Sequence, residues 1–265
     1  NSQAITSSTW TYTAGTITVG TTAWTCTGNF SGGGQTYYAV TLTAINAGPT
    51  VSGNNTFTNL TWSGAGGSAH MILAGNQTVT GAYTRTAGGA NQGNNIKSSV
   101  TGTARTITAA AVSLTNVVFS DITGAGAASP FTGTRLGDAK GNSGITFDTG
   151  VNKYWVGNTA NWNTANVWAT TSGGAGATNN FPLPQDTAIF DANSFSANGQ
   201  TVTANEFGQD AFGSDSLPAI DFSTVTKTIT FLNGHTCTFY GSVTLSANVT
   251  ISGTLTYTYG ARGAQ

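Results

Sequence analysis

Charged side chains are scarce in this sequence. Only 6% of its 265 residues are Asp, Glu, Lys or Arg, against about 25% in ordinary soluble domains. The net charge is −1 and the basic residues are scattered, so the chain has no basic patch of the kind that binds nucleic acid. Sparse charge also removes a usual guard against association at strand edges. We therefore expect partners, either copies of the chain itself or other surface or virion proteins.

Long apolar runs are also missing. No run approaches the roughly 18–20 residues that a membrane-spanning helix needs, so we expect no membrane span. The N-terminus, Asn1-Ser2-Gln3-Ala4, has no basic region followed by an apolar core and therefore does not read as a signal peptide. It lacks an initiator Met, which suggests a processed protein or part of a longer one. Hydrophobic residues make up 38% of the chain, and this proportion argues against disorder.

Cysteine is limited to Cys26 and Cys237, each in a Thr-Cys-Thr context. Alternation along a strand places each Cys on the face opposite its two Thr neighbours. We interpret both as buried free thiols that pack as small apolar side chains. In an elongated stack of strands the two would lie far apart, so a disulfide is expected only if the fold is compact.

Residues that carry catalytic chemistry are few. His70 and His235 have no Cys or acid at metal-ligand spacing, and no nucleophile-elbow, phosphate-loop, zinc-protease or dinucleotide-binding motif is present. The densest acidic region comprises Glu206, Asp210, Asp215 and Asp221. Such acids could form a glycosidase pair or a calcium site, or they could simply cap turns. We assign no catalytic residue, no metal site and no cofactor, and keep this acidic region as a weak alternative.

Thr, Ser, Asn and Gly dominate what is present, and they alternate with Val, Ile, Leu and Phe. This alternation, with no amphipathic helical pattern, predicts an all-β chain. Short strands separated by Gly and Asn corners favour a right-handed parallel β-helix, in which each coil stacks on its neighbours. The longer alternating runs at 9–27 and 236–258 leave an antiparallel β-sandwich as the alternative.

Two fragments look like the same unit used twice. They are T-F-T-N-L-T-W at 56–62 and S-L-T-N-V-V-F-S-D-I at 113–122, and each has a short strand, an Asn and a second short strand. We expect a corner at each Asn, because Asn tolerates turn conformations. The predicted segments are a β region at 1–48, solenoid coils at 49–151, a Trp-rich module at 152–198 and further coils at 199–265.

The Trp-rich module differs in composition from its surroundings. It contains Y-W-V-G-N-T-A-N-W-N-T-A-N-V-W followed, after a Gly-rich spacer, by F-P-L-P-Q-D-T-A-I-F. We expect two tight Asn turns that each deliver a Trp to a common apolar site. Asp186 precedes a predicted strand at 187–190 and is suited to accept backbone N–H groups of the turn.

This module resembles the W-x-G … N-W … N-W … P-x-D-x-x-x-F modules of bacterial autotransporter-type passenger regions and phage-encoded β-helical surface proteins. The matching residues are Trp155, Gly157, Asn161, Trp162, Asn166, Trp168, Pro184, Asp186 and Phe190. The second N-W is broken here to Asn166-Val167-Trp168. The resemblance implies a β-helical protein of an extracellular or virion surface, and its roles are diverse.

Two interpretations of Trp155, Trp162 and Trp168 remain open at this point. They could clamp the core between coils, as most large aromatic side chains do, or form an exposed platform for sugar rings. The second interpretation would make the chain a carbohydrate-binding adhesin that recognises cell-surface glycan.

Thr-x-Thr pairs recur along the chain and raise the possibility of ice binding. Thr56/Thr58 and Thr78/Thr80 are examples. A solenoid ice-binding face needs one pair per coil at constant spacing, whereas the gaps here are irregular and no pair falls between Thr134 and Thr201. Thr is also a favoured strand residue, so the pattern alone disfavours ice binding. The leading prediction is a non-enzymatic structural protein, such as a fibre, spike or capsid decoration, with a tailspike-like glycan depolymerase as a further alternative.

Overall fold

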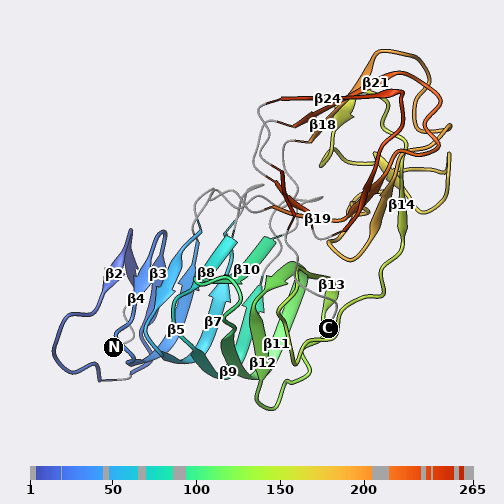
Figure 1. Ribbon diagram of the computed structural model, residues 1–265. Coiled ribbons are helices and arrows are strands. Elements are labelled where there is room, and N and C mark those ends of the chain that lie inside the picture. Colours follow the sequence, from blue (N-terminus) through green and yellow to red (C-terminus); the bar gives the residue numbers. More distant parts are fainter. Residues whose placement is uncertain are drawn as a thin grey trace. The chain divides into compact units, whose positions relative to one another are not determined.

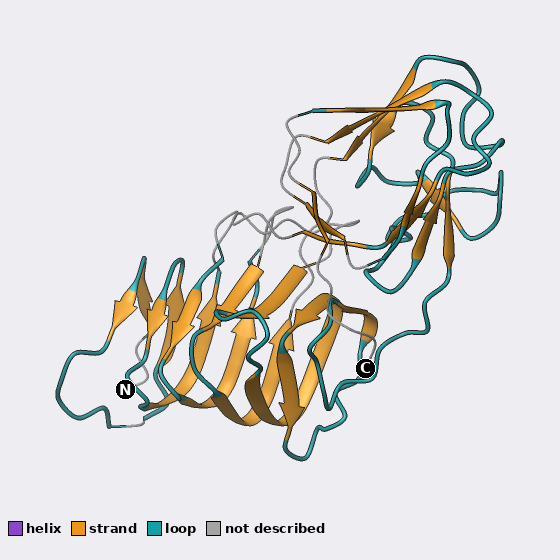
Figure 2. Cartoon of the chain, in the orientation of Figure 1, coloured by secondary structure: helices purple, strands orange, loops and turns teal. Residues whose placement is uncertain are grey.

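The structure is a computed structural model. It describes residues 4–18, 20–43, 48–64, 70–85, 94–204, 215–233, 237–239, 241–253 and 257–259, with 215–217, 233, 237–239 and 257–259 as backbone only. Every helix or strand among these residues is a β-strand (Figure 2). The prediction of an all-β chain is therefore confirmed. The chain divides into two compact units: unit 1 holds residues 1–88 and 94–148, and unit 2 holds 89–93 and 149–265.

Unit 1 contains one 13-stranded parallel sheet, in which successive strands of the chain alternate between two halves (Figure 1). We call the halves sheet A and sheet B. Sheet A comprises β1 (Ile5–Ser7), β3 (Ala23–Cys26), β5 (Thr36–Leu42), β7 (Thr56–Trp62), β9 (Gln77–Arg85), the first part of β11 (Arg105–Ser120) and β12 (Ile122–Ala125). Sheet B comprises β2 (Trp10–Thr11), β4 (Phe30–Ser31), β6 (Thr50–Ser52), β8 (His70–Leu73), β10 (Asn94–Ser98), the second part of β11 and β13 (Thr134–Asp138).

The corner inside β11 lies at Asn116. Its φ of 54° is left-handed, a conformation that Asn adopts more readily than most residues. Arg135 in β13 has a φ of 58° at the matching position, and its Nε donates a 3.1 Å hydrogen bond to the Asn116 Oδ1. Two left-handed residues therefore stack where the chain passes from sheet A to sheet B, which confirms the corner predicted in 113–122.

The corner predicted in 56–62 is wrong. These residues form the continuous strand β7, and Asn59 lies at a register irregularity between β7 and β9. Its Oδ1 accepts a 3.1 Å hydrogen bond from the backbone N–H of Ala82. Asn59 thus satisfies a donor freed by a bulge instead of turning the chain, a distinction that its residue type alone does not make.

Asn and Gln side chains also connect successive strands at the corners that lead from sheet B back to sheet A. Asn54 accepts from the backbone N–H of Asn76 at 2.9 Å, and Asn76 accepts from that of Thr106 at 2.9 Å. Beside them, the buried Asn55 accepts from the Gly34 N–H at 3.0 Å and donates to the Gln77 Oε1 at 3.0 Å. The amide side chains therefore continue the backbone ladder through these corners.

Unit 2 contains three smaller sheets. The first comprises β16 (Trp168–Ala169), β14 (Asn152–Trp155), β17 (Thr187–Ile189), β20 (Ala219–Asp221) and β23 (Val243–Thr244). The second comprises β15 (Ala160–Asn161), β18 (Gln200–Ala204), β21 (Ile229–Asn233) and β24 (Val249–Ser252). The third comprises β19 (Asp215–Leu217), β22 (Cys237–Phe239) and β25 (Tyr257–Tyr259). From β17 onward the chain visits the first, second and third sheets in a fixed order.

Parallel pairing excludes the antiparallel sandwich considered above. Among the described strands, β14 and β16 form the single antiparallel pair. The Trp-rich segment is also not an insertion, because β14 and β17 belong to the first sheet of unit 2 and β15 begins the second. Likewise, the predicted segments 1–48 and 49–151 share sheet A, where β5 pairs with β7. Each unit has its own apolar core.

Candidate functional site

The three Trp side chains proposed as a sugar platform are buried in unit 2. Trp155, Trp162 and Trp168 are 0%, 2% and 1% exposed. The ring centroids of Trp162 and Trp168 lie 4.5 Å apart in an edge-to-face arrangement, and Phe190 packs against all three Trp rings. The Trp168 indole N–H donates to the Trp162 carbonyl at 2.9 Å. These rings present no face to a ligand, so the platform interpretation is corrected to a core clamp.

The local chemistry that positions these rings is as expected. Asn158 and Asn166 have φ values of 53° and 62°, which confirms the left-handed Asn turns on either side of Trp162. Asp186 is buried, and its Oδ1 and Oδ2 accept the backbone N–H groups of Val151 and Leu183 at 2.9 and 2.8 Å. The carboxylate therefore holds the turn before β17 and the start of the Trp segment together, as predicted for the turn.

The acidic region is placed only in part. Glu206 and Asp210 lie outside the described residues, and Asp215 is described as backbone in β19. Asp221 in β20 is half-buried, and its Oδ1 accepts the N–H of Ser223 at 2.8 Å. The one carboxylate of this group whose side chain is described thus caps a turn. Among the described residues no three His, Cys, Asp or Glu side chains gather as metal ligands.

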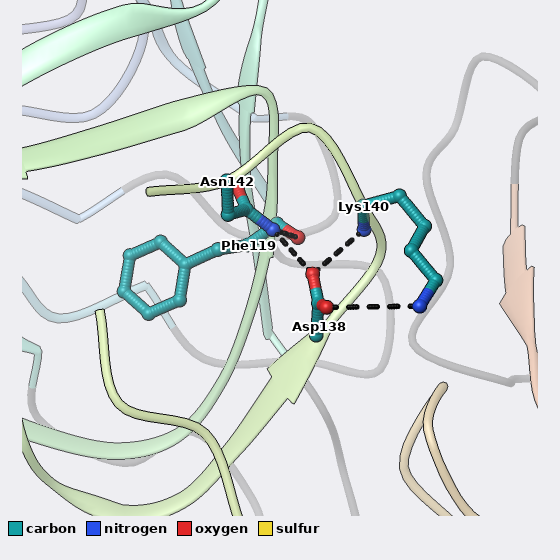
Figure 3. Close-up of polar contacts among 4 residues, drawn as sticks. All are labelled: Phe119, Asp138, Lys140 and Asn142. Atoms are coloured by element: carbon teal, nitrogen blue, oxygen red, sulfur yellow. Dashed lines mark hydrogen bonds and ion pairs between the residues drawn. The ribbon is translucent and has the colours of Figure 1, made fainter. Parts of the chain in front are cut away.

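A polar cluster after β13 shows how carboxylates are used in unit 1 (Figure 3). The Asp138 Oδ1 accepts hydrogen bonds from the Lys140 N–H at 2.9 Å and from the Asn142 Nδ2 at 2.8 Å. The same Asn142 nitrogen donates to the Phe119 carbonyl at 2.8 Å. The Lys140 Nζ lies 3.8 Å from the Asp138 Oδ2 in a partly exposed ion pair, a type worth at most about 1 kcal/mol. The cluster ties a turn to the neighbouring strand.

A buried cation at the end of strand β9 is the feature that sequence reasoning missed. Arg85 is 2% exposed and lies 4.1 Å above the Trp62 ring, and its Nη atoms donate to the carbonyls of Trp62 and Gly64 at 3.1 and 2.8 Å. Burial lowers the pKa of Arg85 to about 10 and raises the pKa of the neighbouring Tyr83 hydroxyl. The sequence did contain a signal for this burial. Alternation along Tyr83-Thr84-Arg85 puts Arg85 on the same strand face as the buried Tyr83.

The Cys and His residues singled out from the sequence are described only in part. Cys26 is a buried free thiol, as predicted, whereas only the backbone of Cys237 is described. His70 is buried at the start of β8, and His235 lies outside the described residues. No helix in the described part of the chain is long and apolar enough to cross a membrane.

Comparison of the chain with protein-family models, curated proteins and solved structures finds no match. The resemblance of the Trp-rich segment to surface-protein modules therefore stays a prediction from the sequence. The site geometry itself consists of capped turns, buried clamps and side chains that link neighbouring strands.

Proposed function

We propose that this chain is a non-enzymatic structural protein of an extracellular or virion surface, built as a right-handed parallel β-helix. A fibre, spike or capsid decoration is the role that fits such an element. Its partners would be copies of itself or other surface proteins, because scarce charge leaves strand edges open to association.

The β-helix part of the proposal is supported by strand order and register. In unit 1 consecutive strands alternate between sheets A and B, and each strand from β1 to β9 pairs in parallel with the strand two positions later in the chain. Thr36 lies opposite Thr56, and Thr56 lies opposite Thr78, so one circuit of the chain takes about twenty residues there. We infer right-handed coils because parallel strand–crossover–strand connections are right-handed in about 98% of cases.

The main support for a structural role is that polar side chains form hydrogen bonds that hold turns and strands together. Of the six acids whose side chains are described, five accept backbone N–H groups at turns: Asp121, Asp138, Asp186, Asp191 and Asp221. Asn and Gln side chains extend the strand ladders at the corners, as Asn54, Asn55 and Gln77 do. Polar groups committed to such bonds stabilise a stack, but they are poorly suited to proton transfer.

The two alternatives have less support. A carbohydrate-binding adhesin would need exposed aromatic rings other than the three buried Trp side chains. A tailspike-like depolymerase would need two carboxylates about 5–10 Å apart, and Asp221 already caps its own turn.

Surface labelling tests the proposal. Antibodies raised against the purified chain are expected to label intact, unpermeabilised cells or particles from the source. Labelling that appears only after permeabilisation would contradict a surface role. Release of reducing ends from surface glycans by the purified chain, abolished by Asp221→Asn, would instead support the depolymerase.

A further inference from the structure

Threonine side chains form columns on the outward face of sheet A. The longest column crosses six strands and comprises Thr6, Thr25, Thr41, Thr61, Thr84 and Ser113. A second column crosses four strands and comprises Thr36, Thr56, Thr78 and Thr108. All ten side chains are half-buried or exposed, while their neighbours Val40, Leu60 and Tyr83 point into the core.

This alignment removes the objection that irregular Thr spacing raised against ice binding. Sixteen residues separate Thr25 from Thr41, and twenty separate Thr41 from Thr61, yet the three lie opposite one another in adjacent strands. The connections between sheets A and B differ in length, and this accounts for the unequal spacing of the Thr residues in the sequence. What matters for a surface is the register in space. Within each column the residues pair directly from strand to strand, and the register shifts of β7 with β9 and of β9 with β11 fall between the two columns.

The columns form an ordered array of one kind of group. Adjacent strands in a sheet lie about 4.7–4.9 Å apart, so each column repeats a hydroxyl and a methyl group at that interval. Thr is stiff at χ1 because it branches at Cβ, and its hydroxyl both donates and accepts. Such an array offers water molecules regularly spaced hydrogen-bond partners.

From β1 to β9 the face is also neutral. The first 84 residues contain no Asp, Glu, Lys or Arg, and the first charged residue, Arg85, is buried. A charged side chain would impose its own hydration shell on nearby water, whereas a crystal face of ice is an uncharged lattice of donors and acceptors. The absence of charge and the regular spacing of hydroxyl groups therefore both suit a crystal face of ice.

We propose that the outward face of sheet A binds ice, with the two Thr columns as the contact surface. Sugar binding is less favoured, because Tyr38 is the one exposed aromatic ring among the described residues of sheet A. The proposal goes beyond the structural role and depends on the strand register and on the absence of charge.

The experiment measures thermal hysteresis and ice shaping of the purified chain by nanolitre osmometry. We expect wild type to facet ice crystals and to give a hysteresis gap. Thr78→Lys changes an exposed position in the second column, and Thr61→Lys changes the centre of the long column; each is expected to abolish the gap. The matched control is Thr50→Lys in sheet B, where the column Thr50–Ile72–Lys97 already carries a lysine, and it should retain activity.

Circular dichroism and thermal melting establish that each variant is folded, and Thr78→Lys is the least disturbing because its side chain is exposed. Absence of hysteresis in wild type overturns the proposal, as does unchanged activity in a folded Thr78→Lys or Thr61→Lys variant. If ice activity is missing, two other results would assign the face to a different partner. Binding to crystalline cellulose or chitin would indicate a glycan surface. Self-association seen by light scattering and abolished by Thr61→Lys would indicate a second copy of the chain.

Discussion

The two units fill their interiors with different chemistry. Unit 1 has a core of aliphatic and aromatic side chains, and it buries several polar side chains in addition, including Asn55, His70, Gln77 and Arg85. Unit 2 packs its interior around a cluster of rings: Trp155, Trp162, Trp168, Phe190, Phe222 and Phe231. Parallel strands can therefore be held in register either by buried side-chain hydrogen bonds or by aromatic packing.

The acids are concentrated in one part of the sequence. All nine acids lie between residues 121 and 221, so the first 120 residues contain none. Arg85 is accordingly held by carbonyl groups and the Trp62 ring. From residue 121 onward Asp side chains cap turns, Asp121 and Asp138 in unit 1 and Asp186, Asp191 and Asp221 in unit 2. Substitutions in the two units should consequently fail for different reasons.

Trp168→Ala should have the largest effect. Trp168 packs against Trp155, Trp162 and Phe190, and removing a buried Trp costs about 3–5 kcal/mol in transfer and cavity terms. Hydrogen exchange is expected to show lost protection in unit 2 while the strands of unit 1 stay protected. Trp24→Ala, at a half-buried position in unit 1, is the control and should cost less. Equal losses from the two substitutions would contradict a Trp-centred core.

Asn55→Ala should have the next largest effect. The change removes the acceptor of the Gly34 N–H and the donor to Gln77, and each buried polar group left unsatisfied costs about 1–3 kcal/mol. Urea unfolding of unit 1 would report the loss as a lower midpoint. Asn54→Ala should shift the midpoint less, because Asn54 is an exposed neighbour whose side chain accepts from the Asn76 N–H. A larger shift for Asn54→Ala than for Asn55→Ala would show that burial is not what makes the corner stable.

Asp186→Ala tests the capped turns of unit 2. The substitution leaves the N–H groups of Val151 and Leu183 without their acceptor, at a cost of about 1–3 kcal/mol. We expect a lower unfolding midpoint for unit 2 with unchanged unit 1. Asp191→Ala is the matched control, because that half-buried carboxylate caps a more exposed turn. If the control destabilised unit 2 as much, the special role of Asp186 would be refuted.

Tyr83→Phe should have the smallest effect at neutral pH, about 1 kcal/mol or less, because no described residue bonds to the buried hydroxyl. At alkaline pH the difference should grow. Burial raises the pKa of Tyr83, so the unfolded chain loses this proton near pH 10 while the folded chain keeps it, and stability falls as pH rises.

The titration of Arg85 changes the stability of the fold in the opposite direction. Its pKa is lowered to about 10 in the fold, so it contributes stability that rises with pH above that value. It is present in both proteins, and the comparison therefore isolates Tyr83. Thermal melting from pH 8 to 11 is the measurement, and wild type should lose more stability than Tyr83→Phe. Parallel curves would show that Tyr83 titrates normally.

Local rules in the sequence were enough to predict several features. Alternation predicted the strands, and Asn chemistry predicted the left-handed turns at Asn116, Asn158 and Asn166. The position of Asp186 before a strand predicted its role as a cap. These features depend on neighbours within a few residues, which is why a sequence reveals them.

Features that depend on register were not predictable in the same way. Asn59 and Asn116 stand in similar sequences, but Asn59 sits at a bulge and Asn116 at a corner, because their partner strands differ. The Thr columns remained hidden because connections of unequal length separate their members. Alternation within β9 indicates the face on which Arg85 lies, but its partners, Trp62 and the Gly64 carbonyl, come from β7 and the residues after it and are not specified by β9.

Residue-resolved amide exchange tests the central claim, that asparagine side chains link neighbouring strands instead of serving chemistry. In wild type the Asn54 Oδ1 accepts the Asn76 N–H, and the Asn76 Oδ1 accepts the Thr106 N–H. We predict that Asn54→Ala speeds exchange at Asn76, and that Asn76→Ala speeds it at Thr106, while the amides of β7 and β9 stay protected. Unchanged exchange at both amides would contradict the account.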